Sequence, residues 1–153
     1  MSSWRQQAMI DAPVQEVWDL LCDPVRSPEW SEDVLAVTGL PTKVEKGSTV
    51  TMKTRGPLGM TSTTPFTVEE LSDMRELKLK CQISGFYSRW LLTEAQGGTF
   101  AELELGIEPI SRRRSVAARA VAALHTKGFL RRHVEKLLDG LRRAVSRDRA
   151  AAS

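Results

Sequence analysis

The stretch Ile10-Asp11-Ala12-Pro13-Val14-Gln15-Glu16-Val17-Trp18-Asp19-Leu20 decides the fold, because it marks the change from a strand to a short helix. The preceding residues, Trp4 to Ile10, predict a strand that ends at Asp11. Pro13 suits the first helical position, where its missing N–H costs nothing, and Pro24 ends the helix. The apolar residues of this helix recur at helical spacing and predict one buried face: Val14, Val17, Trp18 and Leu21. A second helical turn is expected around Ser27 to Ser31, with Trp30 at its end.

The middle of the chain, from about Asp33 to Ile107, follows a period of two residues, which is typical of strands. Glu76 to Ile83 alternates most regularly, and the glycine-rich segments Gly56–Gly59 and Gln96–Gly98 predict turns. The predicted strands are Val34 to Val37, Ser48 to Arg55, Thr61 to Leu71, Glu76 to Ile83, Phe86 to Glu94 and Thr99 to Ile107. Because the turns between them are short, we expect an antiparallel meander.

The last part of the chain predicts one long helix, from a cap at Ser111 or Ser115 to about Arg147. Its apolar residues recur every three or four positions, so one face must lie against the sheet. These residues are Val116, Ala120, Val121, Leu124, Leu130, Val134, Leu137, Leu138, Leu141 and Val145. The predicted fold is α+β, with a single domain over residues 1–148 and a frayed tail at 149–153.

Composition narrows the class of protein. A chain of 153 residues with 41% hydrophobic content can bury one core without disulfides. Cys22 and Cys81 are the two cysteines and lie far apart, so neither a disulfide framework nor a cysteine zinc site is expected. The first residues lack the apolar core of a signal peptide, and no run approaches the ~20 apolar residues of a membrane span. We therefore expect a cytoplasmic protein, as a monomer or a dimer.

Positive charge gathers at the C-terminal end. Residues 1–111 contain 10 basic and 16 acidic side chains, whereas residues 112–153 contain 12 basic and 3 acidic ones. Weak contact with an anionic surface is one interpretation of this segment, and a solvated helix face is the other. No aromatic residues suited to base stacking are interspersed with the arginines, so we expect no specific nucleic-acid partner.

The order of these elements resembles the helix-grip fold of the START-like (SRPBCC) superfamily, whose bacterial members include polyketide cyclase/dehydrase and lipid transport proteins. Four features carry the resemblance: Ile10-x-Ala12-Pro13-x-x-x-Val17-Trp18-x-Leu20, Trp30, the turn Gly97-Gly98-Thr99, and Val134-x-x-Leu137-Leu138-x-x-Leu141. The resemblance covers about residues 5–145. It implies a curved antiparallel sheet of about six to seven strands around the long C-terminal helix, with two short helices after the first strand.

The resemblance also implies an apolar cavity between sheet and helix that holds a small hydrophobic molecule, such as a lipid or a polyketide. Alternation places one face of each strand toward that cavity, and the small residues of the long helix leave room opposite it. The expected ligand-binding residues are Trp30, Val50, Met52, Phe66, Val68, Leu79, Cys81, Trp90, Leu92, Leu103, Leu105, Ala117, Val121, Leu124 and Gly128. The loop Gly56–Gly59 is a candidate flap over the cavity mouth.

The sequence contains few groups suited to catalysis. His125 and His133 are eight residues apart, too far for a helical metal pair, and neither has a recognisable Cys or Asp partner, so no metal or cofactor is expected. Aromatase/cyclase members of the superfamily place an arginine and a serine on a central strand, but the strand Thr64 to Leu71 carries no arginine. Phe66, Val68 and Glu70 are expected to share one face of that strand. The weak catalytic candidates are Glu70, Ser88 and Tyr87.

Three functions follow from these observations. The first is binding, transport or sequestration of a small hydrophobic ligand without catalysis. The second is an enzyme of the polyketide cyclase/dehydratase type. The third is an interaction role for the basic C-terminal helix, as in superfamily members that act on ribosomes or in toxin–antitoxin pairs.

Overall fold

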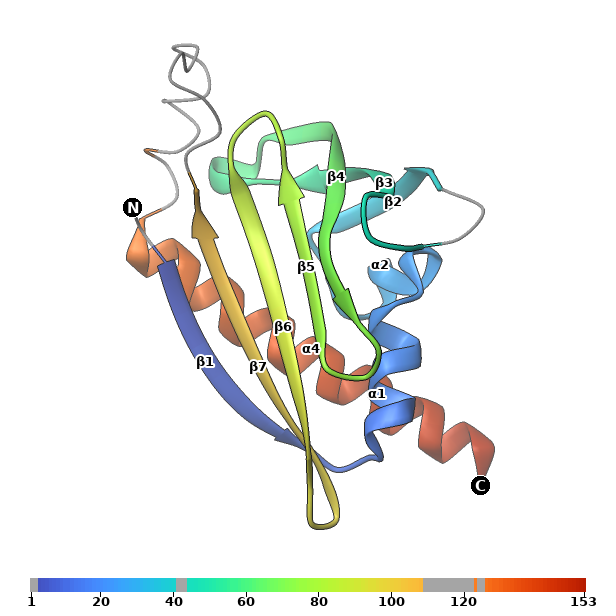
Figure 1. Cartoon of the computed structure of the whole chain (residues 1–153). Coiled ribbons are helices and arrows are strands. Elements are labelled where there is room, and N and C mark those ends of the chain that lie inside the picture. The colour runs from blue at the N-terminus through green and yellow to red at the C-terminus, as the bar shows by residue number, and fades with distance from the viewer. Residues whose placement is uncertain (1–2, 41–43, 109–122, 124–125) are drawn as a thin grey trace.

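The computed structural model of the chain describes residues 3–40, 44–108, 123 and 126–153 (Figure 1). In chain order these residues form β1 (Ser3–Ile10), α1 (Val14–Leu21), the 3-10 turn η1 (Pro24–Arg26), α2 (Ser27–Trp30), β2 (Val34–Gly39), β3 (Thr49–Arg55), the 3-10 turn η2 (Pro57–Gly59), β4 (Thr61–Ser72), β5 (Glu76–Cys81), β6 (Phe86–Ala95), β7 (Gly98–Ile107) and α4 (Lys127–Ala152). The predicted element order is confirmed for this part of the chain.

The described strands form one antiparallel sheet in the order β1-β7-β6-β5-β4-β3-β2. Neighbours in sequence pair as hairpins from β2 to β7, as the short predicted turns require. The first strand pairs with the last, from Ser3 opposite Gly106 to Ile10 opposite Thr99. The sheet is curved and does not close, and β2 and β3 run across the direction of β6 and β7 (Figure 1).

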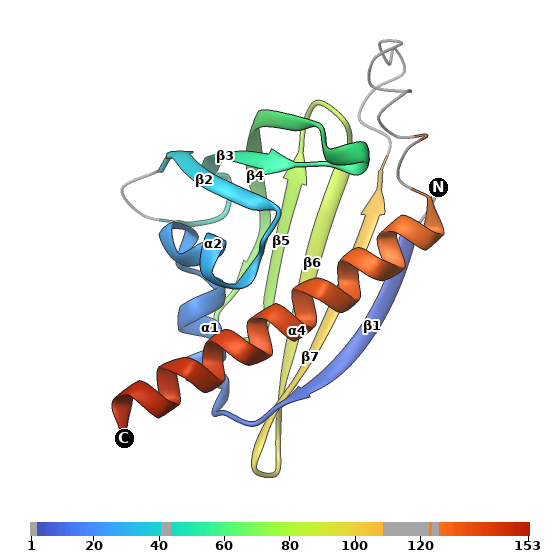
Figure 2. The same cartoon turned by 180° about the vertical axis from the view of Figure 1, so that it is seen from behind.

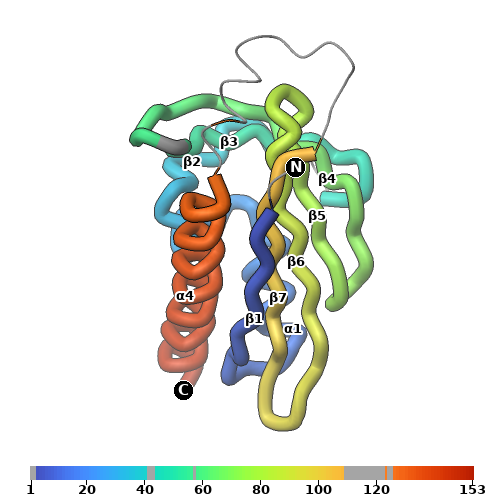
Figure 3. The backbone as a smooth tube through the Cα atoms, turned by 90° about the vertical axis from the view of Figure 1, so that its left-hand side faces the viewer, coloured from blue at the N-terminus to red at the C-terminus, as the bar shows by residue number. Residues whose placement is uncertain are grey.

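Helix α4 crosses one face of the sheet diagonally and packs on β1 and β7 (Figure 2). Seen from the side, it forms a separate layer beside the sheet, while β2 and β3 extend over the end of that layer (Figure 3). Helices α1 and α2 pack against α4 as well. The concave face is therefore bordered by α1 and α2 on one side and by α4 on the other.

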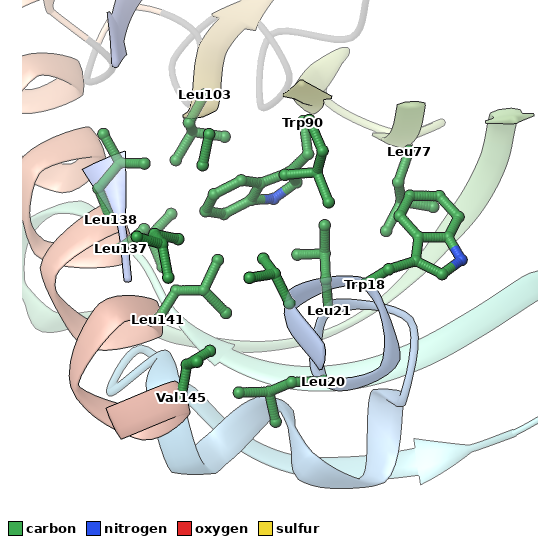
Figure 4. Close-up of a cluster of buried hydrophobic side chains, with 14 of the residues drawn as sticks. Trp18, Leu20, Leu21, Leu77, Trp90, Leu103, Leu137, Leu138, Leu141 and Val145 are labelled. Carbon is green, nitrogen blue, oxygen red and sulfur yellow. The ribbon is translucent and has the colours of Figure 1, made fainter. Parts of the chain in front are cut away.

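The hydrophobic core lies where α1, α4 and the strands β6 and β7 meet (Figure 4). Leu20 of α1 points toward Val145 of α4, and Leu21 points toward Trp90, which reaches in from β6 of the sheet. Burying a leucine side chain fully stabilises the fold by about 1.5–3 kcal/mol. Residues of this cluster that are at most 1% exposed are Ile10, Val17, Leu20, Val68, Ala101, Leu103, Leu105, Leu130, Val134 and Leu141.

The opening motif joins β1 to α1, as predicted, and it contacts the hairpin between β6 and β7. Pro13 precedes the helix as its N-terminal flanking residue. The buried hydroxyl of Thr99 donates a hydrogen bond of 2.8 Å to the carbonyl of Ala12. A Cβ atom at Gly98 would lie 2.5 Å from the carbonyl oxygen of Ile10, so only glycine fits here without movement. This explains why the Gly-Gly-Thr turn and the Ile-x-Ala-Pro segment occur together.

The prediction of one unbroken helix from Ser111 or Ser115 to Arg147 is wrong. Thr126 has an extended backbone, and its Oγ1 accepts a 3.2 Å hydrogen bond from the amide of Phe129, so it caps a helix that begins at Lys127. The helix also continues beyond the predicted end, to Ala152. The residues between Ile107 and Thr126 on which the earlier start was predicted lie almost wholly outside the described part of the chain.

The expectation that Phe66, Val68 and Glu70 share one face of β4 is also wrong. The register between β4 and β5 shifts between Val68 and Glu70, which indicates a β-bulge. The extra residue moves Glu70 to the outer surface, where its carboxylate lies 3.4 Å from the ammonium group of Lys46. Strand β5 ends earlier than predicted, at Cys81, and Ile83 lies exposed in the turn that follows.

Candidate functional site

A pocket of about 420 Å³ lies between the concave face of the sheet and the helices α1, α2 and α4. Its volume falls within the range of small-molecule sites in proteins. Most of its wall is apolar and comes from alternate residues of β3 to β7, as the period of two requires. The lining residues from the strands are Val34, Val50, Met52, Thr54, Arg55, Thr61, Ser62, Thr64, Phe66, Leu77, Leu79, Cys81, Phe86, Ser88, Trp90 and Leu105.

Eight of the residues expected to bind a ligand line this pocket: Trp30, Val50, Met52, Phe66, Leu79, Cys81, Trp90 and Leu105. Val68, Leu92 and Leu103 point to the same face of the sheet but belong to the packed core, away from the pocket. Gly128 is exposed at the start of α4 and does not line the pocket. Ala117, Val121 and Leu124 lie outside the described residues.

The helices contribute pocket residues that the sequence did not single out. Leu21 and Cys22 come from the end of α1, and Ser27 and Ser31 come from the two ends of α2. From α4 come Phe129, His133 and Leu137. The spacing of four between these three residues places them on one helix face, and this was the signal available in the sequence.

His133 has an acidic partner that could not be identified from the sequence. Its Nδ1 lies 3.0 Å from Oδ2 of Asp33, and the two side chains are 14% and 18% exposed. The ring of His133 also stacks on Phe129, with centroids 5.6 Å apart and planes inclined by 19°. The statement that His133 lacks an Asp partner is therefore wrong, because the partner lies a hundred residues earlier, just before β2.

Within the Asp33–His133 pair, the carboxyl group of Asp33 carries a negative charge. The hydrogen bond from His133 holds the pKa of Asp33 below its usual range, although partial burial opposes this shift. The positive charges of Lys136 and Arg55 lower the pKa of Asp33 further. Asp33 is therefore ionised at neutral pH and accepts the Nδ1–H of the imidazole.

Two tryptophans form part of the pocket wall. Trp30 and Trp90 meet edge to face, with ring centroids 5.6 Å apart and planes inclined by 86°. The prediction that Trp90 points inward is confirmed, because it is 2% exposed while its neighbour Arg89 bonds Glu76 on the outer face at 2.8 Å. The indole Nε1 of Trp30 is buried and has no hydrogen-bond partner among the described residues.

Both cysteines line the pocket as free thiols. Burial raises the pKa of Cys22 to about 12, and the nearby carboxylates of Asp73 and Asp19 add to this effect. The thiol of Cys22 is therefore protonated at neutral pH and is a poor nucleophile.

The three catalytic candidates do not converge. Ser88 lies on the pocket, between Leu79 and Leu105 in the sheet. Tyr87 points to the opposite face, where its hydroxyl donates a 2.9 Å hydrogen bond to Glu104. Burial, as the larger cause, and this hydrogen bond both raise the pKa of Tyr87. Glu70 pairs with Lys46 on the outer surface. Only one of the three can therefore touch a molecule in the pocket.

The described residues contain no group of three or more His, Cys, Asp or Glu side chains placed to hold a metal ion. Among the helices of the described ranges, none is long and apolar enough to span a membrane. The turn Gly56–Gly59 lies at the pocket, which Gly56 and the neighbouring Met60 line, while Leu58 is 84% exposed.

Comparison with solved structures identifies the fold. A START superfamily protein from Mycobacterium smegmatis matches with a TM-score of 0.72 at 13% identity, over 95% of this chain and 97% of that chain. A Bacillus halodurans protein matches with a TM-score of 0.72 at 15% identity, over 95% and 97%. An AHSA1-like protein from Aeromonas hydrophila matches with a TM-score of 0.71 at 15% identity, over 96% and 94%.

Sequence comparison extends this result from fold to family. No curated protein matches the chain. The sequence model of the family described as "Polyketide cyclase / dehydrase and lipid transport" matches residues 1–146. This match covers nearly the whole chain, from β1 into α4. The chain therefore belongs to the polyketide cyclase/dehydrase and lipid transport family.

Proposed function

We propose that this protein binds a small hydrophobic molecule in the pocket between the sheet and the helices. The observation that carries the proposal is the 420 Å³ volume, lined mainly by apolar side chains from six strands and three helices. Affinity comes from apolar surface removed from water, at about 25 cal/mol per Å². The few polar groups on the wall orient the molecule.

The placement of polar side chains favours binding over the cyclase/dehydratase alternative. Of the three catalytic candidates, Glu70 and Tyr87 form pairs on the outer face of the sheet. No hydrogen bond joins Ser88 to His133, the histidine among the described residues, whose Nδ1 lies 3.0 Å from Asp33. A nucleophile needs an adjacent base to activate it, and no such arrangement involves Ser88 among the described residues.

The basic surface of α4 gives little support to an interaction role. Most of its described cations have partners within the chain: Lys136 with Glu32, Arg142 and Arg143 with Asp139, Arg147 with the carbonyl of Glu29, and Arg149 with Glu16. Arg112 to Arg114 lie outside the described residues.

The test of the binding proposal is to fill the pocket and measure an apolar probe. N-Phenyl-1-naphthylamine is neutral and fluoresces when it leaves water, so it reports binding directly. Ser88→Phe places a ring in the pocket, and we expect probe affinity to fall at least tenfold. The matched control is Thr93→Phe, which adds a ring at an exposed position of the same strand.

Ser88 is a better position for this substitution than Gly128, which the sequence predicted as a ligand-binding residue, because Gly128 does not line the pocket. Circular dichroism and thermal unfolding check that both variants fold. Equal probe affinity in wild type, Ser88→Phe and Thr93→Phe would show that the probe does not enter this pocket, and the proposal would be wrong.

A further inference from the structure

The charged side chains of the pocket wall gather in one place. Asp33 precedes β2, Arg55 ends β3, and His133 lies in the second turn of α4, and these are the charged or imidazole side chains among its described lining residues. The amide of Arg55 donates a 2.7 Å hydrogen bond to the carbonyl of Asp33, which brings the two residues together. The rest of the wall is apolar or carries hydroxyl or thiol groups.

Within this cluster, the carboxylate of Asp33 has a side-chain partner, whereas the guanidinium of Arg55 has none among the described residues. Asp33 accepts the hydrogen bond from His133 at 3.0 Å. Arg55 makes no side-chain hydrogen bond or ion pair with any described residue, although its charge acts on Asp33. Many other arginines of the described chain do have a partner, such as Arg5, Arg26 and Arg89. Arg55 lines the pocket as an exposed residue and has no side-chain partner among the described residues, so its guanidinium is available to a ligand.

The hydrogen-bonding groups of Arg55 and His133 that have no partner among the described residues are complementary to a carboxyl group. The guanidinium of Arg55 has five donors, no acceptor and a permanent charge. With Nδ1 bonded to Asp33, the other imidazole nitrogen of His133, Nε2, accepts the proton of a carboxylic acid or, in the charged ring, donates to a carboxylate. A carboxyl group satisfies both side chains, and the charge-assisted bonds are about twice as strong as neutral ones.

We propose that Arg55 and the Asp33–His133 pair form a polar anchor for the carboxyl group of an amphipathic acid, whose apolar body occupies the pocket. This inference rests on the proposed function, because it names the chemical class of the bound molecule. Asp33 acts as a positioning residue: it holds the imidazole by Nδ1 and leaves Nε2 for the ligand. The wall formed by Val50, Met52 and Phe66 receives the chain of the acid.

The experiment compares three ligands with the same alkyl chain: dodecanoic acid, methyl dodecanoate and dodecan-1-ol. Each displaces N-phenyl-1-naphthylamine from the wild-type protein. We expect the acid to bind at least tenfold more tightly than the ester, with the alcohol between them. In Arg55→Gln and His133→Asn, we expect affinity for the acid to fall about ten times more than affinity for the ester and for the naphthylamine.

The matched control is Arg132→Gln, which removes one positive charge from the exposed surface of α4 beside His133. It keeps the preference for the acid if the anchor is specific, and loses it if the preference reflects only the net charge of the helix. Arg55 is exposed, so Arg55→Gln tests the anchor without disturbing the core.

Two failures are distinguishable. Equal affinity for acid and ester, together with normal naphthylamine binding, would overturn the anchor and leave the binding function intact. An equal loss of acid affinity in Arg132→Gln and Arg55→Gln would also overturn the anchor. If neither the naphthylamine nor any of the three ligands bound, the proposed function itself would be wrong.

Discussion

Gly140→Ala is expected to destabilise this protein although alanine favours helices. Gly140 lies buried within α4, at the point where the helix crosses α2. A Cβ atom here would lie well inside 3.0 Å of the carbonyl oxygen of Trp30 and 3.1 Å from its carbonyl carbon. Both are backbone atoms, so no side-chain rotation relieves the clash. The two helices must move apart, because overpacked sites relieve their clashes by backbone shifts.

The magnitude follows from two opposing effects. Overpacking of this kind costs about 1–3 kcal/mol. Alanine stabilises a helix interior by about 1 kcal/mol relative to glycine. Because the clash is with backbone atoms, the cost lies in the upper half of this range, and the net expectation is a loss of about 1–2 kcal/mol, which lowers the melting temperature by roughly 2–8 °C in a chain of this size. Because Trp30 moves with α2, its fluorescence should change as well.

The assay is urea unfolding followed by circular dichroism, with Gly128→Ala as the control in the same helix. A Cβ atom at Gly128 meets nothing closer than 3.8 Å, and the nearest atom is the end of the Arg132 side chain. Gly128→Ala should therefore leave stability unchanged or raise it by up to about 1 kcal/mol. If Gly140→Ala proved as stable as the wild type, the close contact of α4 and α2 would be refuted.

Three further predictions concern single side chains. Burial opposes ionisation of Glu104, but hydrogen bonds from Arg5 and Tyr87 prevail and lower its pKa, so the carboxylate stabilises the fold above about pH 4.3 and the gain is lost on acidification. Glu104→Gln should thus flatten the fall of urea midpoints between about pH 5 and 3, and an unchanged slope would contradict this. Because its pKa is raised, Cys22 should react with a thiol reagent at pH 8 more slowly in the folded protein than in the unfolded protein. Bound N-phenyl-1-naphthylamine should slow the reaction further. Equal rates in folded and unfolded protein would argue against a buried thiol. Trp30→Phe should cost less than about 1 kcal/mol, because it removes a buried N–H that has no partner among the described residues. A loss as large as that of Trp30→Ala would show that the indole nitrogen has a partner.

The sequence alone predicted the architecture, because that information is local. Alternation in β5 and β6 assigned the faces of the strands, including the inward face that carries Trp90. Helical spacing identified the buried side of α1. Where a local signal was weak the prediction failed, as at Thr126, whose capping role is visible only once its backbone is seen to be extended.

The tertiary structure decided which part of each inward face is open. Val68, Leu92 and Leu103 share their face with residues of the pocket but are covered by packed helices, and alternation cannot tell covered from open surface. One inserted residue in β4 carried Glu70 away from the pocket, because a bulge reverses the alternation beyond it. The alternation of side chains along a strand therefore predicts which face of the sheet each one occupies. Whether that side chain is covered depends on the element that packs against the face.

The polar part of the site was decided entirely by tertiary structure. Asp33 and His133 are a hundred residues apart, and Arg55 comes from a third element, where its amide bonds the carbonyl of Asp33. Each taken alone has the sequence environment of a surface residue. They come together because β2, β3 and α4 meet at one end of the pocket, and periodicity carries no information about such a meeting. The sequence thus determined the family and the framework, whereas packing of distant elements determined the site.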